Sequence, residues 1–108
     1  MDRNTLCELV NGILDIMQDY IVEIVLYGSV ARGTNTEDSD VDIALLLNDK
    51  FSSEIEEQLS DFIVEMNLKY DKVFSVIDID YSNFVKWSEI LPFYKNVNKE
   101  GVVLWKAA

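Results

Sequence analysis

The sequence contains no histidine, and this absence excludes two common kinds of site. General-base catalysis by an imidazole and zinc centres built on histidine ligands both require that side chain. Cysteine is also scarce: Cys7 is the only one in 108 residues, so no intramolecular disulfide can form. A single thiol without a disulfide framework is typical of a reducing compartment, and we expect a cytoplasmic protein.

Basic residues are few, with nine Lys and Arg against twenty Asp and Glu and a formal net charge of −11. Binding to the backbone of DNA or RNA, or to an anionic membrane, requires clustered Lys and Arg, so the charge argues against both partners. No apolar run approaches the ~20 residues that a membrane-spanning helix needs. Nearly half of the residues are apolar, and we expect one small domain over residues 1–108.

Two apolar runs joined by a polar segment form the most informative part of the chain. Residues 22–27 are β-branched and aromatic, as in a buried strand, and they end at Gly28-Ser29. Ten residues later, Asp40-Val41-Asp42 opens a second run of this kind, which ends at Leu47. Because residues alternate between the two faces of a strand, Asp40 and Asp42 are expected to point the same way.

The residue types at these positions suit a metal ion and a phosphate. Two neighbouring carboxylates repel each other unless a cation lies between them. Their oxygens suit Mg²⁺, which typically takes one or two carboxylates and completes its shell with water and substrate phosphates. Gly28 allows the backbone to approach a phosphate closely, and Ser29 offers a hydroxyl and a backbone N–H.

This pattern of Gly-Ser, ten residues and Asp-x-Asp resembles the signature of the DNA polymerase beta-like nucleotidyltransferases. It is most similar to the minimal nucleotidyltransferase (MNT) branch, of the MntA-like antitoxin type, with Arg32-Gly33 in the usual Ala-Arg-Gly position. The resemblance implies that Asp40 and Asp42 hold two Mg²⁺ ions. Gly28 and Ser29 would hold the triphosphate of ATP or another nucleoside triphosphate. For Arg32 it leaves two roles open, contact with the phosphates or folding of the loop.

Periodicity along the rest of the chain predicts an α+β fold. We expect a small mixed sheet of about four strands with helices on one face and the carboxylates on the other, which is the nucleotidyltransferase core that the resemblance implies. The expected helices are 4–19, 53–69, 82–89 and a short one from Pro92 to about Glu100. The expected strands are 21–27, 41–47, 72–79 and 102–105, and a polar ligand loop covers 28–39.

Full catalysis in this family usually uses a third acid on the third strand, and two residues compete for that position. Asp78 is an acid on the strand, but alignment of Val76 to Ile79 with the family pattern places Ser75 in the position instead. Ser75 and Asp78 are an odd number of residues apart, so a regular strand points them to opposite faces. Either Asp78 fills the role through a bulge or another register, or the third acid is missing.

Three functions remain open at this point. The first is an enzyme that transfers a nucleotidyl group, AMP from ATP, to a hydroxyl of a protein, as the antitoxin of a HEPN-type toxin. The alternative is a catalytically weak or inactive module of the same fold that neutralises a partner by contact. The third is transfer of a nucleotidyl group to a small molecule. Such enzymes generally need an additional helical domain to build the acceptor pocket, and in a chain of 108 residues a homo-oligomer would have to supply that pocket.

Overall fold

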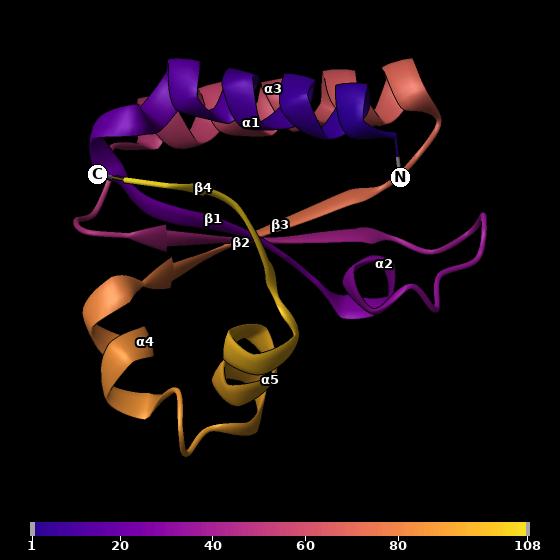
Figure 1. The fold of residues 1–108 in the computed structure, drawn as a ribbon. Helices are drawn as coiled ribbons and strands as arrows, with labels where there is room; N and C mark the ends of the chain where they lie inside the picture. Colours follow the sequence, from indigo (N-terminus) through magenta and orange to yellow (C-terminus); the bar gives the residue numbers. More distant parts are fainter. Residues whose placement is uncertain (1, 108) are drawn as a thin grey trace.

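A computed structural model describes residues 2–107 and shows a four-stranded sheet with helices on both sides (Figure 1). No helix within these residues is both long enough and apolar enough to cross a membrane. The elements follow one another as α1 (Arg3–Met17), a 3-10 turn η1 (Gln18–Tyr20), β1 (Ile21–Tyr27), α2 (Gly28–Arg32), β2 (Val41–Leu47), α3 (Ser53–Tyr70), β3 (Phe74–Asp80), α4 (Tyr81–Trp87), α5 (Pro92–Glu100) and β4 (Val102–Lys106). The predicted α+β class with a mixed four-stranded sheet is confirmed.

The sheet has the strand order β3-β2-β1-β4. Strand β1 runs antiparallel to both β2 and β4, whereas β2 and β3 run parallel to each other. In this register Tyr27 lies opposite Asp42, and Asp42 lies opposite Ser75. The end of β1 and the beginnings of β2 and β3 therefore lie side by side at the same end of the sheet.

Helices α1 and α3 cover one face of the sheet (Figure 1). Gly12 of α1 faces Phe62 of α3 so closely that a Cβ at position 12 would overlap the ring, and this lets the two helices pack tightly. The buried core on this side contains Leu9, Ile13, Met17, Ile21, Ile24, Leu26, Val41, Ile43, Leu45, Leu47, Leu59, Met66 and Phe74.

The opposite face of the sheet is also covered, by α4 and α5, which differs from the expectation of helices on one face only (Figure 1). Phe84 of α4 and Val97 of α5 are buried against Ala44, Leu46 and Ile79. Only the first residue of this face of β2, Asp42, is polar, and the apolar residues that follow it require cover from water. The carboxylates therefore share their face with two short helices.

Hydrogen bonds at the end of α3 determine where β3 begins. The side-chain oxygen of Asn67 accepts a hydrogen bond from the backbone N–H of Phe74 at 2.8 Å. The backbone N–H of Val41 donates to the carbonyl of Val73 at 2.8 Å. These two bonds hold the start of β3 beside the start of β2, and they thereby place Ser75 next to Asp42.

The segment 28–39, which the sequence predicts as a loop, begins with a helix instead. Residues Gly28–Arg32 form α2, and Gly33 ends it in the left-handed conformation with φ 72°. A helix of five residues is too short to show a periodic pattern, so the sequence carries no sign of it. The exposed segment after Gly33 then returns the chain to Asp40.

Candidate active site

Gly28 and Asp42 are in direct contact where β1 ends and β2 begins. Gly28 has φ +78°, a conformation that side-chain-bearing residues rarely adopt. A Cβ at this position would overlap the Asp42 carboxylate oxygen Oδ2 and would lie 3.2 Å from its Cγ. Because Gly28 has no side chain, the Asp42 carboxylate can occupy this space, and the backbone of Gly28 stays accessible beside it.

The two carboxylates of the Asp-x-Asp sequence influence each other. Asp42 is partly buried, whereas Asp40 is exposed just before β2. Burial raises the pKa of the Asp42 carboxyl group, the charge of Asp40 raises it further, and the charge of Arg32 lowers it. Such a pair of oxygen donors, close enough to repel, is chemically matched to a hard divalent cation such as Mg²⁺. The residues present therefore fit a divalent metal ion.

Arg32 lies beside this pair at the end of α2. Its guanidinium forms an ion pair with Glu100 of α5, with an Nη1–Oε2 distance of 3.2 Å, and both side chains are nearly half exposed. The charge of Arg32 also acts on Asp42, where it opposes the rise in the pKa of the carboxyl group that burial and Asp40 cause. A cavity of about 190 Å³ separates α2 from α5 at this point and reaches Gly28.

Ser29, the other predicted phosphate ligand, follows Gly28 in the first turn of α2. Its carbonyl accepts a hydrogen bond from the backbone N–H of Thr34 at 3.0 Å, which closes the turn after the helix. Its hydroxyl forms no side-chain hydrogen bond within residues 2–107, so it is available to a ligand. Gly28, Ser29 and Arg32 thus lie on one short helix whose first residue touches Asp42.

The structure places Ser75, and not Asp78, beside Asp42. Ser75 is the direct neighbour of Asp42 in the parallel β2–β3 pair, and neighbours in register project from the same face. Asp78 is paired with Leu45, whose side chain belongs to the core under α1 and α3, so it lies on the opposite face. The strand contains no bulge that would reverse this, and the possibility that Asp78 reaches the carboxylate pair is not realised here.

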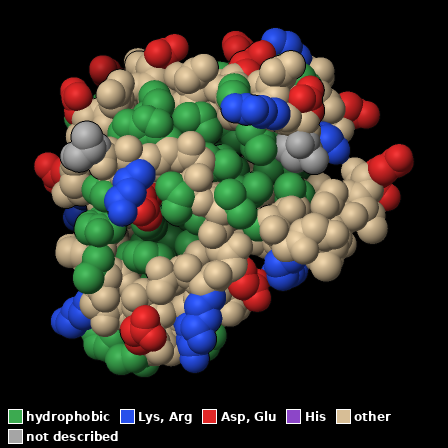
Figure 2. All heavy atoms as spheres, in the orientation of Figure 1, with side chains coloured by type: hydrophobic (Ala, Val, Ile, Leu, Met, Phe, Trp, Pro, Cys, Tyr) green, Lys and Arg blue, Asp and Glu red, His purple; other side chains and the backbone are tan. Residues whose placement is uncertain are grey.

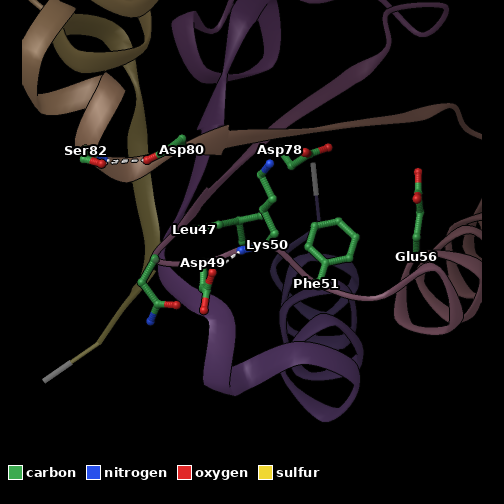
Figure 3. Close-up of a pocket in the computed structure, with 9 residues that line it drawn as sticks. Leu47, Asp49, Lys50, Phe51, Glu56, Asp78, Asp80 and Ser82 are labelled. Atoms are coloured by element: carbon green, nitrogen blue, oxygen red, sulfur yellow. Dashed lines mark hydrogen bonds between the residues drawn. The ribbon is translucent and has the colours of Figure 1, made fainter.

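Asp78 instead lines a different cavity, of about 560 Å³, together with Lys50, Phe51 and Asp80 (Figure 3). Asp80 turns to Ser82, from which it accepts hydrogen bonds at 2.9 Å from both the backbone N–H and the hydroxyl, and so caps α4. Within residues 2–107 no group of three or more acidic, cysteine or histidine side chains is arranged to hold a metal ion. The site therefore has two acids where the family resemblance implies three.

Comparison with known proteins identifies the family of the chain. Residues 6–103 match the family model described as a nucleotidyltransferase domain. The chain belongs to the nucleotidyltransferase domain family. Two Methanocaldococcus jannaschii proteins that carry the name "Putative protein adenylyltransferase" are similar over most of its length. MJ0604 is 32% identical over 96% of this chain and 98% of its own, and MJ0141 is 31% identical over 77% and 82%.

Solved structures of nucleotidyltransferase folds resemble this chain in architecture. A variant of the MntA–HpeT toxin–antitoxin pair superimposes with a TM-score of 0.64 at 20% identity, covering 99% of this chain and 75% of the other. A toxin–antitoxin structure with AMP-PNP gives a TM-score of 0.59 at 24% identity, with coverages of 90% and 73%. A Shewanella oneidensis complex of a tri-AMPylated HEPN toxin with an MNT antitoxin gives 0.52 at 20% identity, with coverages of 94% and 73%. These similarities establish the fold.

Two residues near the site were not identified from the sequence. Tyr27 is paired with Asp42 across β1 and β2, and burial together with the charge of Asp42 raises the pKa of its phenol. Glu100 reaches Arg32 from a helix 68 positions away in the sequence. Tyr27 directly precedes Gly28-Ser29, and this position could have indicated from the sequence that it lies near the site. No local sequence pattern connects Glu100 to the site.

Proposed function

We propose that this chain binds a nucleoside triphosphate with Mg²⁺ at Gly28, Ser29, Asp40 and Asp42 and transfers AMP from ATP to a hydroxyl of a protein. The observation that carries the proposal is the contact of Gly28 with Asp42, because it brings a backbone that a phosphate could approach next to the carboxylate that we propose as a metal ligand. The name of the two archaeal relatives, "Putative protein adenylyltransferase", supports the choice of AMP and of a protein acceptor.

The partner that we propose is a HEPN-type toxin. The support is the fold similarity to MNT antitoxins, one of which accompanies a tri-AMPylated HEPN toxin. A short open sheet cannot exclude water from a phosphoryl-transfer site by itself, so a protein acceptor that covers the site would also complete it. AMP attached to a hydroxyl that the toxin needs would then inactivate the toxin.

The reaction makes modest demands on the residues of this chain. The acceptor hydroxyl oxygen forms a bond to the α-phosphorus, the bond from this phosphorus to the bridging oxygen breaks, and pyrophosphate leaves. Asp40 and Asp42 would hold Mg²⁺, which when bound neutralises charge on the triphosphate and on the leaving group. Ser29 would donate hydrogen bonds to the phosphates, and Arg32 would turn from Glu100 to add a positive charge.

This chain has no carboxylate at the position of the family's third acid, so no such group is present to accept the proton of the acceptor hydroxyl. Ser75 occupies that place beside Asp42, and a serine hydroxyl is not a base at neutral pH. The proton would pass to water or to a group on the acceptor protein. We therefore expect transfer to be slow in comparison with a site that contains three acids.

The same observation favours a second candidate function, a nucleotide-binding module that neutralises its partner by contact alone. In that case the chain would bind Mg²⁺ and ATP without transferring AMP. The two candidates differ in whether Asp40 and Asp42 are needed for neutralisation, since only the enzymatic route uses them.

Intact-mass spectrometry distinguishes the two. The purified protein is incubated with Mg²⁺ and ATP together with a HEPN-type toxin protein, and we expect the toxin to gain one or more AMP units. Asp40→Asn should abolish the gain, whereas Asp38→Asn, which removes an exposed acid from the same loop, should not. Transfer that survives in Asp40→Asn would refute the assignment.

A second variant, Ser75→Asp, tests the missing acid directly. It places a carboxylate opposite Asp42 in the β2–β3 register, and it should raise the rate of transfer at least about 10-fold if the missing base limits the reaction. If neither the natural protein nor Ser75→Asp transfers AMP while both bind Mg²⁺ and ATP in calorimetry, the chain is a contact module.

A further inference from the structure

Five large apolar side chains are exposed to solvent within nine residues where α4 connects to α5: Val85, Trp87, Ile90, Leu91 and Phe93, together the α4–α5 surface. At this end of the molecule, hydrophobic side chains reach the surface beside basic ones (Figure 2). We propose that the α4–α5 surface binds the protein acceptor, and that the acceptor presents there an apolar patch rimmed by carboxylates. The inference rests on the proposed function and specifies the chemistry of its partner.

The exposed side chains of this surface stand on an ordered turn. The backbone N–H groups of Ile90 and Leu91 both donate to the carbonyl of Trp87, at 3.0 and 2.9 Å. The two helices cover the sheet with other residues, Phe84 and Val97, so the exposed side chains are not needed for the core. Single exposed apolar residues are common, but a contiguous group of them is typical of an interaction site.

The charge of this region is opposite to that of the rest of the chain. Residues 81–108 contain four Lys and two Glu, a net charge of +2, whereas residues 1–80 contain five Lys or Arg and eighteen Asp or Glu, a net charge of −13. Glu100, one of the two acids, is paired with Arg32. No ion pair within residues 2–107 uses Lys86, Lys95 or Lys99. Electrostatic complementarity therefore favours carboxylates on the partner.

Basic and apolar side chains are in contact at the border of the surface. The ammonium group of Lys86 lies 5.0 Å from the centre of the Trp87 ring. An apolar centre with a polar rim is the usual arrangement of a protein–protein interface. Lysines beside apolar residues also suit an anionic membrane, but the charge of −13 on the rest of the chain would be repelled by one. A protein partner is therefore favoured.

The α4–α5 surface continues into the candidate active site. Phe93 packs edge-to-face on Tyr27, with ring centroids 5.6 Å apart and an interplanar angle of 85°. Tyr27 directly precedes Gly28 and is paired with Asp42 across the strands. A protein that covers Phe93 therefore lies next to the carboxylates, where it could present a hydroxyl and exclude water from the site.

Calorimetry of the full chain with a HEPN-type toxin protein tests the apolar part of the surface. Val85→Ser combined with Ile90→Ser should weaken toxin binding at least about 10-fold. The control combines Val64→Ser with Leu68→Ser, which removes two exposed apolar side chains from α3, on the other face of the sheet, and should leave toxin binding unchanged. All four side chains are more than half exposed, so both variants should bind Mg²⁺ and ATP as the natural protein does. Equal losses of toxin binding in both variants, or no loss in either, would overturn the inference.

A charge reversal tests the carboxylate rim of the partner. Lys95→Glu should weaken toxin binding about 3-fold or more at low ionic strength, and the loss should shrink as salt screens the charges. Lys72→Glu makes the same change in the turn after α3, and toxin binding should stay within about 2-fold of the natural protein. A loss in Lys95→Glu that does not depend on salt, or an equal loss in Lys72→Glu, would contradict the rim.

Intact-mass measurement of AMP on the toxin separates this inference from the proposed function. If AMP is transferred while the variant Val85→Ser with Ile90→Ser binds the toxin normally, this surface is wrong and the function stands. If the toxin binds through this surface but gains no AMP, the transfer is wrong and the surface stands. A natural protein that does not bind the toxin would overturn both. Co-sedimentation with vesicles of phosphatidylglycerol and phosphatidylcholine should be absent, and its presence would identify a membrane contact and overturn the inference.

Discussion

Replacement of Gly28 by alanine should damage both stability and nucleotide binding, and Gly33 provides a matched control. Both glycines have positive φ, +78° and +72°, so alanine at either position carries the strain of the left-handed conformation, about 1–2 kcal/mol. They differ in their surroundings. A Cβ at position 28 would overlap Oδ2 of Asp42, whereas a Cβ at position 33 would have no atom within 4 Å among the described residues.

The expected magnitudes follow from this difference. Gly33→Ala should lower the free energy of unfolding by about 1–2 kcal/mol. Each kcal/mol corresponds to roughly 4–8 °C in Tm for a domain of 60–100 residues, and a chain of this length should be near the lower end. Gly28→Ala adds the cost of displacing a packed neighbour, about 1–3 kcal/mol, for a total of roughly 2–5 kcal/mol. It also moves the carboxylate that we propose as a metal ligand.

Urea denaturation followed by the fluorescence of Trp87 and Trp105 measures the stabilities, and calorimetry with Mg²⁺ and ATP measures binding. Gly33→Ala should bind ATP as the natural protein does, and Gly28→Ala, assayed at a temperature where it remains folded, should bind it at least about 10-fold more weakly. Equal stability losses and normal ATP binding in both variants would refute the inference that Gly28 exists to accommodate Asp42.

Three further predictions concern charge and metal. Because burial and Asp40 raise the pKa of Asp42, the folded state binds its proton more tightly than the unfolded state, and stability falls as the pH rises through that pKa. Asp42→Asn should therefore be more stable at pH 7, by up to about 1 kcal/mol, and this gain should disappear below the ordinary pKa of 3.8; equal gains at both pH values would contradict the cause. Hydrogen bonds from Lys69 and Tyr70 lower the pKa of Glu8, so its contribution to stability is present above the ordinary value of 4.5 and is lost as the pH falls; Glu8→Gln should flatten this part of an acid-unfolding curve. Finally, Mg²⁺ with ATP should raise the Tm of the natural protein, EDTA should reverse the shift, and Asp40→Asn should show none.

The sequence contains enough information for most of the architecture. The strands 21–27 and 41–47 and the helix 92–100 were predicted with the bounds that the structure has, and the other five predicted elements differ by one or two residues at one or both ends. These segments bury one face or stripe of side chains, and burial imposes a period of 2 or 3.6 that is visible in the residues themselves. The spacing of Gly28-Ser29 and Asp40-Val41-Asp42 was equally legible, because both motifs lie at the ends of such strands.

Tertiary structure decided what no local pattern contains. The short helices α4 and α5 lie on the face of the carboxylates because the apolar side chains of Ala44 and Leu46 on that face must be covered from water. This need follows from how the strands assemble into the sheet, and no single segment of sequence shows it. Glu100 meets Arg32 only after the chain has crossed the whole domain. The choice between Ser75 and Asp78 depended on strand register. Their odd separation in the sequence shows that the two side chains point to opposite faces of the strand, but it does not show which of them lies on the same face as Asp42. The pairing of Asp42 with Ser75, anchored by the hydrogen bond from Phe74 to Asn67, settles it, because register is a property of two strands and not of either sequence alone.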